Sequence, residues 1–264
     1  MSEESMDALV IIDPQNDFCA PAGSLYVDGA REDIARLASH ISRDGARYSA
    51  VFVSLDSHDA VAIFHPGFWL DGEGLSPKPF TSITEPDYRK GSFRTRVPAH
   101  AGCAERMFRV MAAKNISSLI VWPEHCIVST WGHAIAESLV QALSEWRGAS
   151  QKPVRYIFKG ENPYTEQFSI FEGLDDEWPE TAFNKSLCDA LSAYDSVTFA
   201  GEALSHCVEA SISSYVRCGG NAVLRQKKFV LADCSSPVSG FGRTECESSL
   251  SSLGVELISS IDGF

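Results

Sequence analysis

Three residues able to take part in nucleophilic chemistry stand where apolar runs of the sequence end. Asp13 and Lys159 each come directly after such a run, and Cys207 follows a third run across a short turn. If these runs are parallel strands, their carboxyl ends meet at one edge of a sheet, where open α/β sheets bind ligands. A carboxylate, an amine and a thiol that converge there form a nucleophilic site. The sequence therefore predicts Asp13, Lys159 and Cys207 as catalytic residues.

The thiol of Cys207 has a second favourable feature, because a helical pattern begins at Val208. Free backbone N–H groups and the dipole at a helix N-terminus stabilise a thiolate, so we expect a lowered pKa for this cysteine. His206 is its neighbour in the sequence, but adjacent helical residues point roughly 100° apart and do not face each other. We therefore interpret His206 as a pocket wall or a merely local residue.

A second set of residues has the composition of a metal site. Asp56 and His58 follow one apolar run, and two residues this far apart in extended chain project to the same side. His125 follows the next run along the chain. One carboxylate and two imidazoles suit a divalent metal with open positions, with zinc favoured over iron or manganese. His65 is a possible further ligand, whereas Cys126, the residue after a ligand, would point away from the metal. The alternative to a metal site is that each histidine makes only local contacts.

An alternation of strand-like and helical segments must position these residues. The apolar runs are rich in β-branched residues and lie at Ala8–Ile12, Ala50–Leu55, Ser118–Trp122, Val154–Phe158, Ser196–Ala200 and Phe229–Ala232, with a weaker one near Val255–Ile258. Amphipathic segments between them lie at Arg31–Arg43, His133–Trp146, Ser186–Ala193, Val208–Arg217 and Thr244–Leu253. Asp28 and Asn184 are typical helix-start residues. The pattern predicts a three-layer α/β/α fold with a mainly parallel six-stranded sheet covered on both faces.

One stretch interrupts this alternation. Residues 66–100 are rich in Gly, Pro, Ser and Thr and show little periodicity. Such a stretch is typical either of surface decoration or of a lid or oligomer arm beside an active site. We interpret the chain as one domain, residues 1–264, with an insertion at about 66–100.

The composition excludes several kinds of partner. The 264 residues carry a formal net charge of -13, which repels nucleic-acid backbones and anionic membrane surfaces. No apolar run approaches the roughly 20 residues that span a bilayer. The first seven residues, MSEESMD, are acidic and polar, so we expect no targeting peptide and a cytoplasmic protein. We therefore interpret the eight cysteines as reduced thiols.

The motifs, taken in order, match a known family. They span roughly residues 8–235 and are Asp13–Phe18, Asp56–His58, Trp122–Cys126, Lys159–Gly160, and Ala203 with Cys207–Ser211. This set resembles the nicotinamidases of the isochorismatase-like cysteine hydrolase superfamily. The sequence departs from the family pattern at Ser205, where Asp is common, after Asp56, where the usual Trp and Pro are absent, and in the long spacing from His58 to His125. These departures bear on the substrate more than on the chemistry.

The resemblance implies roles for individual residues. Asp13, Lys159 and Cys207 would be the catalytic triad, and the backbone N–H groups of Ala203 and Cys207 would form an oxyanion hole. It also implies a cis peptide bond between Glu202 and Ala203. The metal would be held by the set already identified, and the ring of the substrate would lie between Phe18, Trp122 and, less closely matched, Phe168.

The implied reaction is hydrolysis of nicotinamide to nicotinate and ammonia. Asp13 would take the proton of Cys207, the thiolate would attack the carboxamide, and water would release the acid from the resulting thioester. This reaction belongs to NAD salvage, in pyridine nucleotide metabolism, and its partner would be a small amide substrate; a homo-oligomer is compatible with it. Two alternatives stay open: hydrolysis of another small amide or ureide by the same triad, and a non-catalytic protein that binds a small ligand or a partner.

Overall fold

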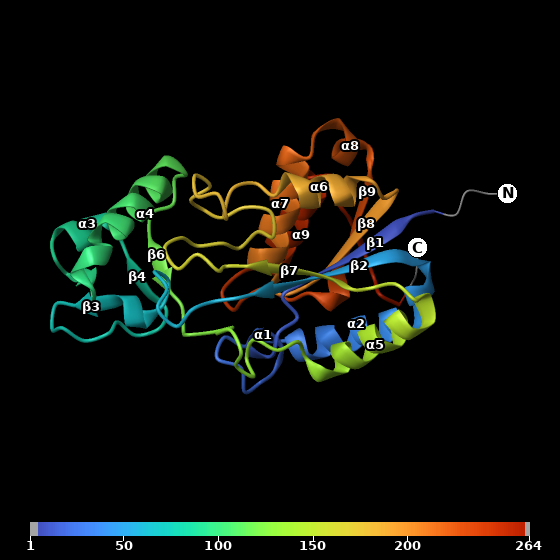
Figure 1. Ribbon diagram of the computed structural model, residues 1–264, viewed down its shortest axis with the longest axis horizontal. Coiled ribbons are helices and arrows are strands. Elements are labelled where there is room, and N and C mark those ends of the chain that lie inside the picture. Colours follow the sequence, from blue (N-terminus) through green and yellow to red (C-terminus); the bar gives the residue numbers. More distant parts are fainter. Residues whose placement is uncertain (1–4, 262–264) are drawn as a thin grey trace.

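The central element of the protein is a six-stranded sheet in which every neighbouring pair of strands is parallel. A computed structural model describes residues 5–261 (Figure 1). The strand order is β10-β9-β8-β1-β2-β7. These strands are β1 (Asp7–Ile12), β2 (Tyr48–Asp56), β7 (Arg155–Lys159), β8 (Ser196–Gly201), β9 (Lys227–Leu231) and β10 (Glu256–Ile258). The predicted α/β class and the six-stranded sheet are therefore confirmed.

Helices cover both faces of this sheet and make it the middle of three layers (Figure 1). On β1, Ala8, Val10 and Ile12 pack into one core and Leu9 and Ile11 into the other, as the two-residue period of a strand requires. The helices are α1 (Asn16–Cys19), α2 (Ala30–Asp44), α3 (Glu85–Arg89), α4 (Ala101–Ala113), α5 (Glu137–Ser150), α6 (Lys185–Ser192), α7 (Glu209–Cys218), α8 (Gly220–Arg225) and α9 (Arg243–Ser252). Helices α2 and α5 cover the face of Leu9, and α6, α7 and α9 cover the face of Ala8.

Of the two expected helix-start residues, one acts as a cap. The Asn184 side chain accepts a hydrogen bond of 3.0 Å from the Leu187 N–H and caps α6. Asp28 does not cap α2, because the N-cap residue is Gly29, whose φ of 93° lies in the left-handed region. A Cβ at this position would also lie 2.8 Å from the Ser236 Oγ, so the turn requires glycine.

The run Ser118–Trp122 does not join the central sheet. It forms β6 (Leu119–Val121), which pairs antiparallel with β4 (Thr81–Ile83). The weaker run near the C-terminus, as β10, takes the sixth place in the sheet instead. The expectation for Ser118–Trp122 was wrong because its partner strand lies inside the stretch 66–100, where no periodicity indicates a strand.

The helix expected from His133 begins only at Glu137. Residues 133–136 form a turn, a bend and one isolated antiparallel bridge between Ile135 and Gln15 instead, and they bind the loop after β1. The Asn16 N–H donates to the Ala134 oxygen at 2.9 Å, and the Ala136 N–H donates to the Pro14 oxygen at 2.9 Å. Their backbone groups are therefore used to fix the loop that carries Asp13.

The edge strand β7 also differs from the expectation that each strand is covered on both faces. Tyr156 is 44% exposed and Phe158 is 56% exposed. Only its last residue, Lys159, is fully buried in this strand. The apolar composition of Val154–Phe158 therefore did not reveal that the strand lies at the open edge of the sheet.

A smaller lobe lies beyond the carboxyl ends of β1, β2 and β7 and appears in green and cyan at the left of Figure 1. It contains β3 (Trp69–Asp71), β4, α3, β5 (Phe93–Thr95), α4 and β6. The side chains of Phe64, Trp69, Phe108 and Val121 are among those that form its core. Residues 66–100 thus hold three short strands, one α-helix and two 3-10 helices, and their status as an insertion within one domain stays a prediction.

Short helices complete the chain: η1 (Gly45–Arg47), η2 (Pro66–Phe68), η3 (Pro98–His100), η5 (Ala232–Cys234) and the π-helix η4 (Leu204–Val208). Within residues 5–261, no helix combines the length and apolar composition that a membrane span needs. All eight cysteines fall within this range and are free thiols.

Candidate active site

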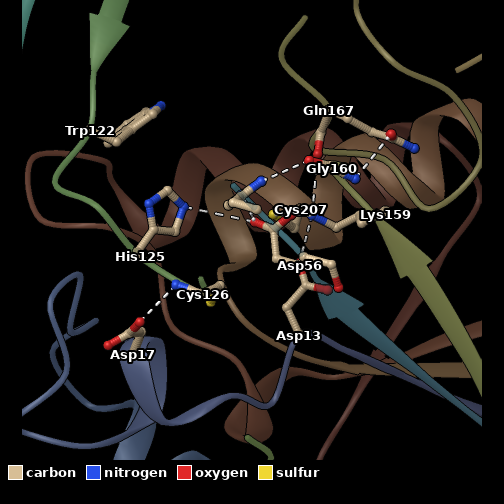
Figure 2. Close-up of polar contacts among 12 residues, drawn as sticks. Asp13, Asp17, Asp56, Trp122, His125, Cys126, Lys159, Gly160, Gln167 and Cys207 are labelled. Atoms are coloured by element: carbon tan, nitrogen blue, oxygen red, sulfur yellow. Dashed lines mark hydrogen bonds and ion pairs between the residues drawn. The ribbon is translucent and has the colours of Figure 1, made fainter. Parts of the chain in front are cut away.

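The three residues predicted to be catalytic come together at the carboxyl edge of the sheet. Asp13 follows β1, Lys159 ends β7, and Cys207 lies in η4 just after β8. The Lys159 Nζ lies 3.0 Å from the Asp13 Oδ2 and 3.6 Å from the Cys207 Sγ (Figure 2). All three side chains are buried. The topology therefore assembles an acid, an amine and a thiol from three strands, as the strand-end argument predicts.

One lysine serves two carboxylates at this site. The Lys159 Nζ also lies 2.8 Å from the Asp56 Oδ1 and donates to the Gln167 backbone oxygen at 3.2 Å. The Ser54 Oγ donates to the Asp13 Oδ1 at 2.6 Å. Lys159 is therefore the shared counter-ion of two buried carboxyl groups.

Burial and charge together set the protonation of this cluster. Burial alone would lower the pKa of Lys159, but the Asp13 and Asp56 carboxylates raise it well above its ordinary value. Burial raises the pKa of Asp13, and the neighbouring Asp56 charge adds to this effect while Lys159 opposes it. A carboxyl group with a raised pKa is a better proton acceptor. Asp13 is therefore suited to the role of general base.

The pKa of the Cys207 thiol differs in direction from the sequence prediction. Burial raises it well above the ordinary value, and the nearby Lys159 charge opposes the rise without cancelling it. The expected effect of a helix terminus is smaller than the cost of burying a thiolate. The nucleophile therefore needs a base to remove its proton, and one oxygen of Asp13 lies within 4.8 Å of the Cys207 sulfur.

The predicted metal set also comes together. One ligand atom from each of Asp56, His58 and His125 lies within 4.8 Å of the others, and all three residues are buried. The His58 Nε2 is 3.0 Å and the His125 Nε2 is 3.9 Å from the Asp56 Oδ2. The two imidazole rings lie 4.9 Å apart between their centroids.

The hydrogen bonds of the two Nδ1 atoms show that this set of residues fits a metal. The His58 Nδ1 bonds to the Gly160 oxygen at 3.0 Å, and the His125 Nδ1 bonds to the Pro123 oxygen at 2.8 Å. A carbonyl accepts only from a protonated nitrogen, so the Nδ1 atom of each ring carries a proton, and each Nε2 becomes a ligand for a metal once it gives up its own proton. This is the arrangement that proteins use to orient histidine ligands. The three residues can therefore hold one divalent cation.

Two further candidates lie beside this set without joining it. The His65 Nε2 is 3.3 Å from the Nδ1 of His125, on the side away from Asp56, and the His65 Nδ1 bonds to the Asp59 oxygen at 3.2 Å. The backbone N–H of Cys126 donates to the Asp17 Oδ2 at 2.7 Å (Figure 2). Neither His65 nor Cys126 belongs to the group of mutually close ligand atoms among the described residues.

Several supporting residues fix these strand ends. The Gln15 side chain accepts from the Asp56 N–H at 2.7 Å and donates to the Asp56 oxygen at 2.8 Å. Gly160 has a φ of 77°, and a Cβ there would lie 2.4 Å from the His58 Cε1. The motif residues Gln15, Asp17 and Gly160 thus hold the reactive groups in place.

A narrow pocket reaches the cluster. It has a volume of about 30 Å³. Its walls include the predicted residues Phe18, Trp122, Phe168 and Ala203, and Cys207 also lines it. The described residues that line it are Phe18, Leu25, Val27, Asp56, Trp122, His125, Glu166, Phe168, Ala203, His206, Cys207 and Val238. Aromatic walls on a narrow slot are suited to a flat ring.

His206 lies in the wall of this pocket. Its ring centroid is 5.6 Å from Trp122, 5.4 Å from Phe168 and 4.7 Å from Phe241. Burial lowers its pKa to about 4. It is therefore a neutral aromatic group here, in agreement with its interpretation as a wall.

Sequence reasoning missed one charged residue of the pocket. Glu166 is buried, and its Oε2 accepts a hydrogen bond of 3.2 Å from the Trp122 indole N–H. Burial raises its pKa to about 7. Glu166 lies in an irregular loop after β7, where no periodicity or motif could have indicated it.

A larger chamber continues outward from the narrow pocket. Its volume is about 640 Å³, and Met111, Ile116 and Phe80 of the small lobe line part of it. Phe80 and Phe241 are 60% and 52% exposed. The residues that line both spaces are Leu25, Trp122, Glu166, Phe168, His206 and Val238. The chamber therefore extends the pocket with a mostly apolar surface.

The peptide bond between Glu202 and Ala203 is cis, as the resemblance implies. Ala203 lines the narrow pocket beside Cys207. The use of their N–H groups as an oxyanion hole stays a prediction.

Comparisons with known proteins agree with this geometry. No family model matches the chain. It is 27% identical over 235 residues to the nicotinamidase of Saccharomyces cerevisiae, with 89% of each chain covered. It is 27% identical over 216 residues to the nicotinamidase/pyrazinamidase of Mycobacterium tuberculosis, with 81% of each covered.

Solved structures show the same fold. The yeast nicotinamidase bound to the inhibitor nicotinaldehyde superposes with a TM-score of 0.68 at 22% identity, covering 96% of this chain and 100% of that chain. The pyrazinamidase of Pyrococcus horikoshii in complex with zinc superposes with a TM-score of 0.55 at 17% identity, covering 96% and 98%.

Proposed function

We propose that this chain, which resembles the nicotinamidases of the isochorismatase-like superfamily in sequence and fold, hydrolyses nicotinamide to nicotinate and ammonia. The observation that carries the proposal is the buried convergence of Asp13, Lys159 and Cys207, with Cys207 lining one aromatic-walled pocket. Its relatives at 27% identity are nicotinamidases, and they align with most of the chain.

The triad residues would form and use the nucleophile. Asp13 takes the proton of Cys207, and the ammonium group of Lys159, 3.6 Å from the sulfur, stabilises the thiolate. The thiolate attacks the carboxamide carbon, and the N–H groups of Ala203 and Cys207 bind the negative oxygen that forms. Asp13 then protonates the departing amine, so ammonia leaves and a thioester remains on Cys207. Water hydrolyses the thioester and releases nicotinate.

The metal set would orient the substrate. A divalent cation held by Asp56, His58 and His125 would bind the pyridine nitrogen and withdraw electron density from the carboxamide. Zinc is the metal that the donor set favours and that the Pyrococcus horikoshii enzyme holds. On the protein side, Phe18, Trp122 and Phe168 would hold the ring between their faces.

The substrate indicates the pathway of the reaction, and the cysteine content indicates its cell compartment. Nicotinate production places the enzyme in NAD salvage, within pyridine nucleotide metabolism. Free thiols at all eight cysteines favour a reducing compartment, so we propose a cytoplasmic location. A neutral amide needs no electrostatic attraction to a surface of net charge -13, and a homo-oligomer would leave this mechanism unchanged.

The outer chamber favours a second candidate function. Its volume of about 640 Å³ exceeds what nicotinamide needs, and its walls are mostly apolar. The same triad could therefore hydrolyse a related aromatic amide that carries an apolar substituent. This candidate shares the chemistry and differs only in the substrate.

Ammonia release from a panel of amides tests both candidates. The purified protein is assayed with nicotinamide, pyrazinamide, an alkyl-substituted nicotinamide and a ureide, with and without a chelator. We expect nicotinamide to be turned over and the chelator to abolish turnover. Preference for the substituted amide by tenfold or more in kcat/KM would support the second candidate. Release of ammonia from none of them would overturn both and favour a binding protein.

A further inference from the structure

A pair of buried carboxyl groups that the proposed reaction does not use lies behind the oxyanion-hole segment. Glu202 follows β8 directly and is 0% exposed, and Asp33 on α2 is 1% exposed. Glu202 precedes Ala203, whose N–H group is proposed to bind the oxyanion. Their side chains come from the sheet and from the helix layer that covers it.

The hydrogen bonds of these two groups leave one oxygen of each without a donor. The Glu202 Oε2 accepts from the Ser236 N–H at 3.2 Å, and the Asp33 Oδ1 is paired with the Arg36 guanidinium. Within residues 5–261, the Glu202 Oε1 and the Asp33 Oδ2 have no conventional donor. Both groups lie beside Ser236, because Glu202 accepts from its N–H and the turn that carries Asp33 begins at Gly29, where a Cβ would lie 2.8 Å from the Ser236 Oγ. The Asp33 carboxyl is close enough to raise the pKa of Glu202 through its charge and a side-chain hydrogen bond.

Two ionised carboxylates in such contact would repel each other, and each would leave a buried oxygen unsatisfied. A single proton removes both costs, because a protonated carboxyl donates to a carboxylate. The Arg36 guanidinium pairs with Asp33, so we assign the proton to Glu202. Burial and then the charge of Asp33 raise the pKa of Glu202 well above its ordinary value.

The surrounding charged and titratable groups do not offer an alternative partner to Glu202. The Arg243 guanidinium donates to the Ser235 and Ala232 oxygens, each at 2.9 Å, and the Asp233 carboxylate accepts from Ser260 at 2.7 Å. The groups that face the pair are Arg36 of α2, Cys19 of α1, Asp233 of η5 and Arg243 of α9.

The pair is connected to the segment that carries Ala203. The Ser235 Oγ donates to the Gly201 oxygen at 2.6 Å, and the Leu204 N–H donates to the Ser236 oxygen at 2.9 Å. Glu202 adds its bond to the Ser236 N–H and its contact with α2. The segment 201–204 is thus bound on one side to residues 235–236 and on the other to Asp33.

We propose that Asp33 and Glu202 share one proton and act as a positioning pair that holds the Ala203 N–H group in place for the oxyanion. The role in turnover rests on the proposed function, whereas the shared proton does not. When rising pH removes the proton, the two carboxylates repel each other and the segment loses its contact with α2. We therefore expect kcat to fall on the alkaline side with little change in KM.

Two substitutions of Glu202 separate the proton from the shape of the side chain. Glu202→Gln keeps a permanent donor toward Asp33 and an acceptor for Ser236, so we expect kcat within about threefold of wild type and loss of the alkaline fall that the pair causes. Glu202→Met keeps the volume and removes both bonds, so we expect kcat to fall tenfold or more while KM stays within about twofold. Glu32→Gln, on an exposed residue next to Asp33, is the matched control. It should leave both kcat and its alkaline fall unchanged.

An infrared measurement tests the proton independently of activity. Wild type at neutral pH should show the carbonyl stretch of a protonated, buried carboxylic acid that Glu202→Gln lacks. The stretch is read from the difference between the two spectra, because Glu166, with a pKa raised to about 7 by burial, contributes to both. Asp33→Asn, which supplies a donor from the other side, should also lack it, and it keeps the test available if Glu202→Gln does not fold.

The possible outcomes distinguish a failure of the positioning pair from a failure of the proposed function. Absence of the band in wild type, or an equal loss of kcat in Glu202→Gln and Glu202→Met, would overturn the positioning pair. A band that behaves as expected in a protein that releases no ammonia would support the shared proton and count against the proposed function.

Discussion

Two pairs of buried carboxyl groups lie at the carboxyl edge of the sheet and differ in what surrounds them. Asp13 and Asp56 share the ammonium group of Lys159, which lies 3.0 Å from one and 2.8 Å from the other. Asp33 and Glu202 are equally buried, but the Arg36 guanidinium reaches only Asp33. In the first pair a buried cation compensates the charge, and in the second a proton does.

The difference shows how one protein gives four buried carboxyl groups different chemistry. Burial would raise the pKa of Asp56, yet His58 and Lys159 hold it well below the usual range, so it stays available as a metal ligand. Burial raises the pKa of Glu202, and no buried cation opposes it strongly. The position of the cations, rather than the depth of burial, decides which carboxyl groups act as ligand or base and which hold a proton.

Removing the cation of the first pair should have the largest effect. Lys159→Met would remove the cation that Asp13 and Asp56 share and leave the buried Asp13 without a counter-ion, so we expect stability to fall by about 3–5 kcal/mol and turnover by at least about 10³-fold. Urea unfolding and ammonia release measure these effects. Lys185→Met, on a lysine whose side chain is 77% exposed, should change stability by less than about 0.5 kcal/mol. Equal effects of the two substitutions would contradict the role of Lys159 as a shared counter-ion.

Removing the charge of Asp56 should have the next largest effect. Asp56→Asn keeps the shape of the side chain but weakens a site that needs an anionic ligand, so we expect the bound metal to fall below stoichiometric amounts. Turnover should fall at least about 100-fold. Analysis of the purified protein measures the metal content, and ammonia release measures turnover. Asp59→Asn, at an exposed residue, is the control. Full metal content in Asp56→Asn would exclude Asp56 as a ligand.

The protonated pair predicts a pH dependence of stability. An acid whose folded pKa is raised contributes its full stability below its unfolded pKa, and this contribution is lost as pH rises toward the folded pKa. Wild type should therefore lose stability relative to Glu202→Gln by up to about 1.4 kcal/mol per pH unit, starting above about pH 4.3. Urea unfolding of both proteins at pH 5, 6 and 7 measures the difference. A constant difference across this range would mean that Glu202 is ionised in the folded protein.

A substitution outside both pairs should have the smallest effect. Phe241 lines the outer chamber and is 52% exposed. Phe241→Ala should leave kcat/KM for nicotinamide within about threefold and lower that for an amide with an apolar substituent by about 1 kcal/mol, or roughly fivefold. Competition assays with both amides measure the ratio. An equal loss for the two substrates would place Phe241 in contact with the shared part of the substrate.

The sequence predicted the parts of the site that depend on strand ends. Asp13, Asp56 and Lys159 follow mostly apolar runs, and such runs form parallel strands whose ends must meet. His125 was placed near this edge for the same reason, although β6 does not belong to the central sheet. A loop leads from β6 to the site and brings His125 there.

The rest depends on long-range contacts that no local pattern reveals. β6 pairs with Thr81–Ile83, a segment with no strand-like periodicity. Glu166 and Glu202 are charged residues in loops, where a sequence alone favours solvent exposure, yet the packing buries both. The pKa of Cys207 was predicted in the wrong direction because a helix terminus can be read from the sequence and the degree of burial cannot.

The most direct test of the account is a stoichiometric assay of nicotinamide hydrolysis. The metal-loaded protein and its Cys207→Ser variant are incubated with nicotinamide, and ammonia and nicotinate are quantified together. We expect equal amounts of the two products from wild type and none from Cys207→Ser, with metal content and folding of the variant unchanged. Turnover by Cys207→Ser near the wild-type rate, or no products from the metal-loaded wild type, would contradict the central claim.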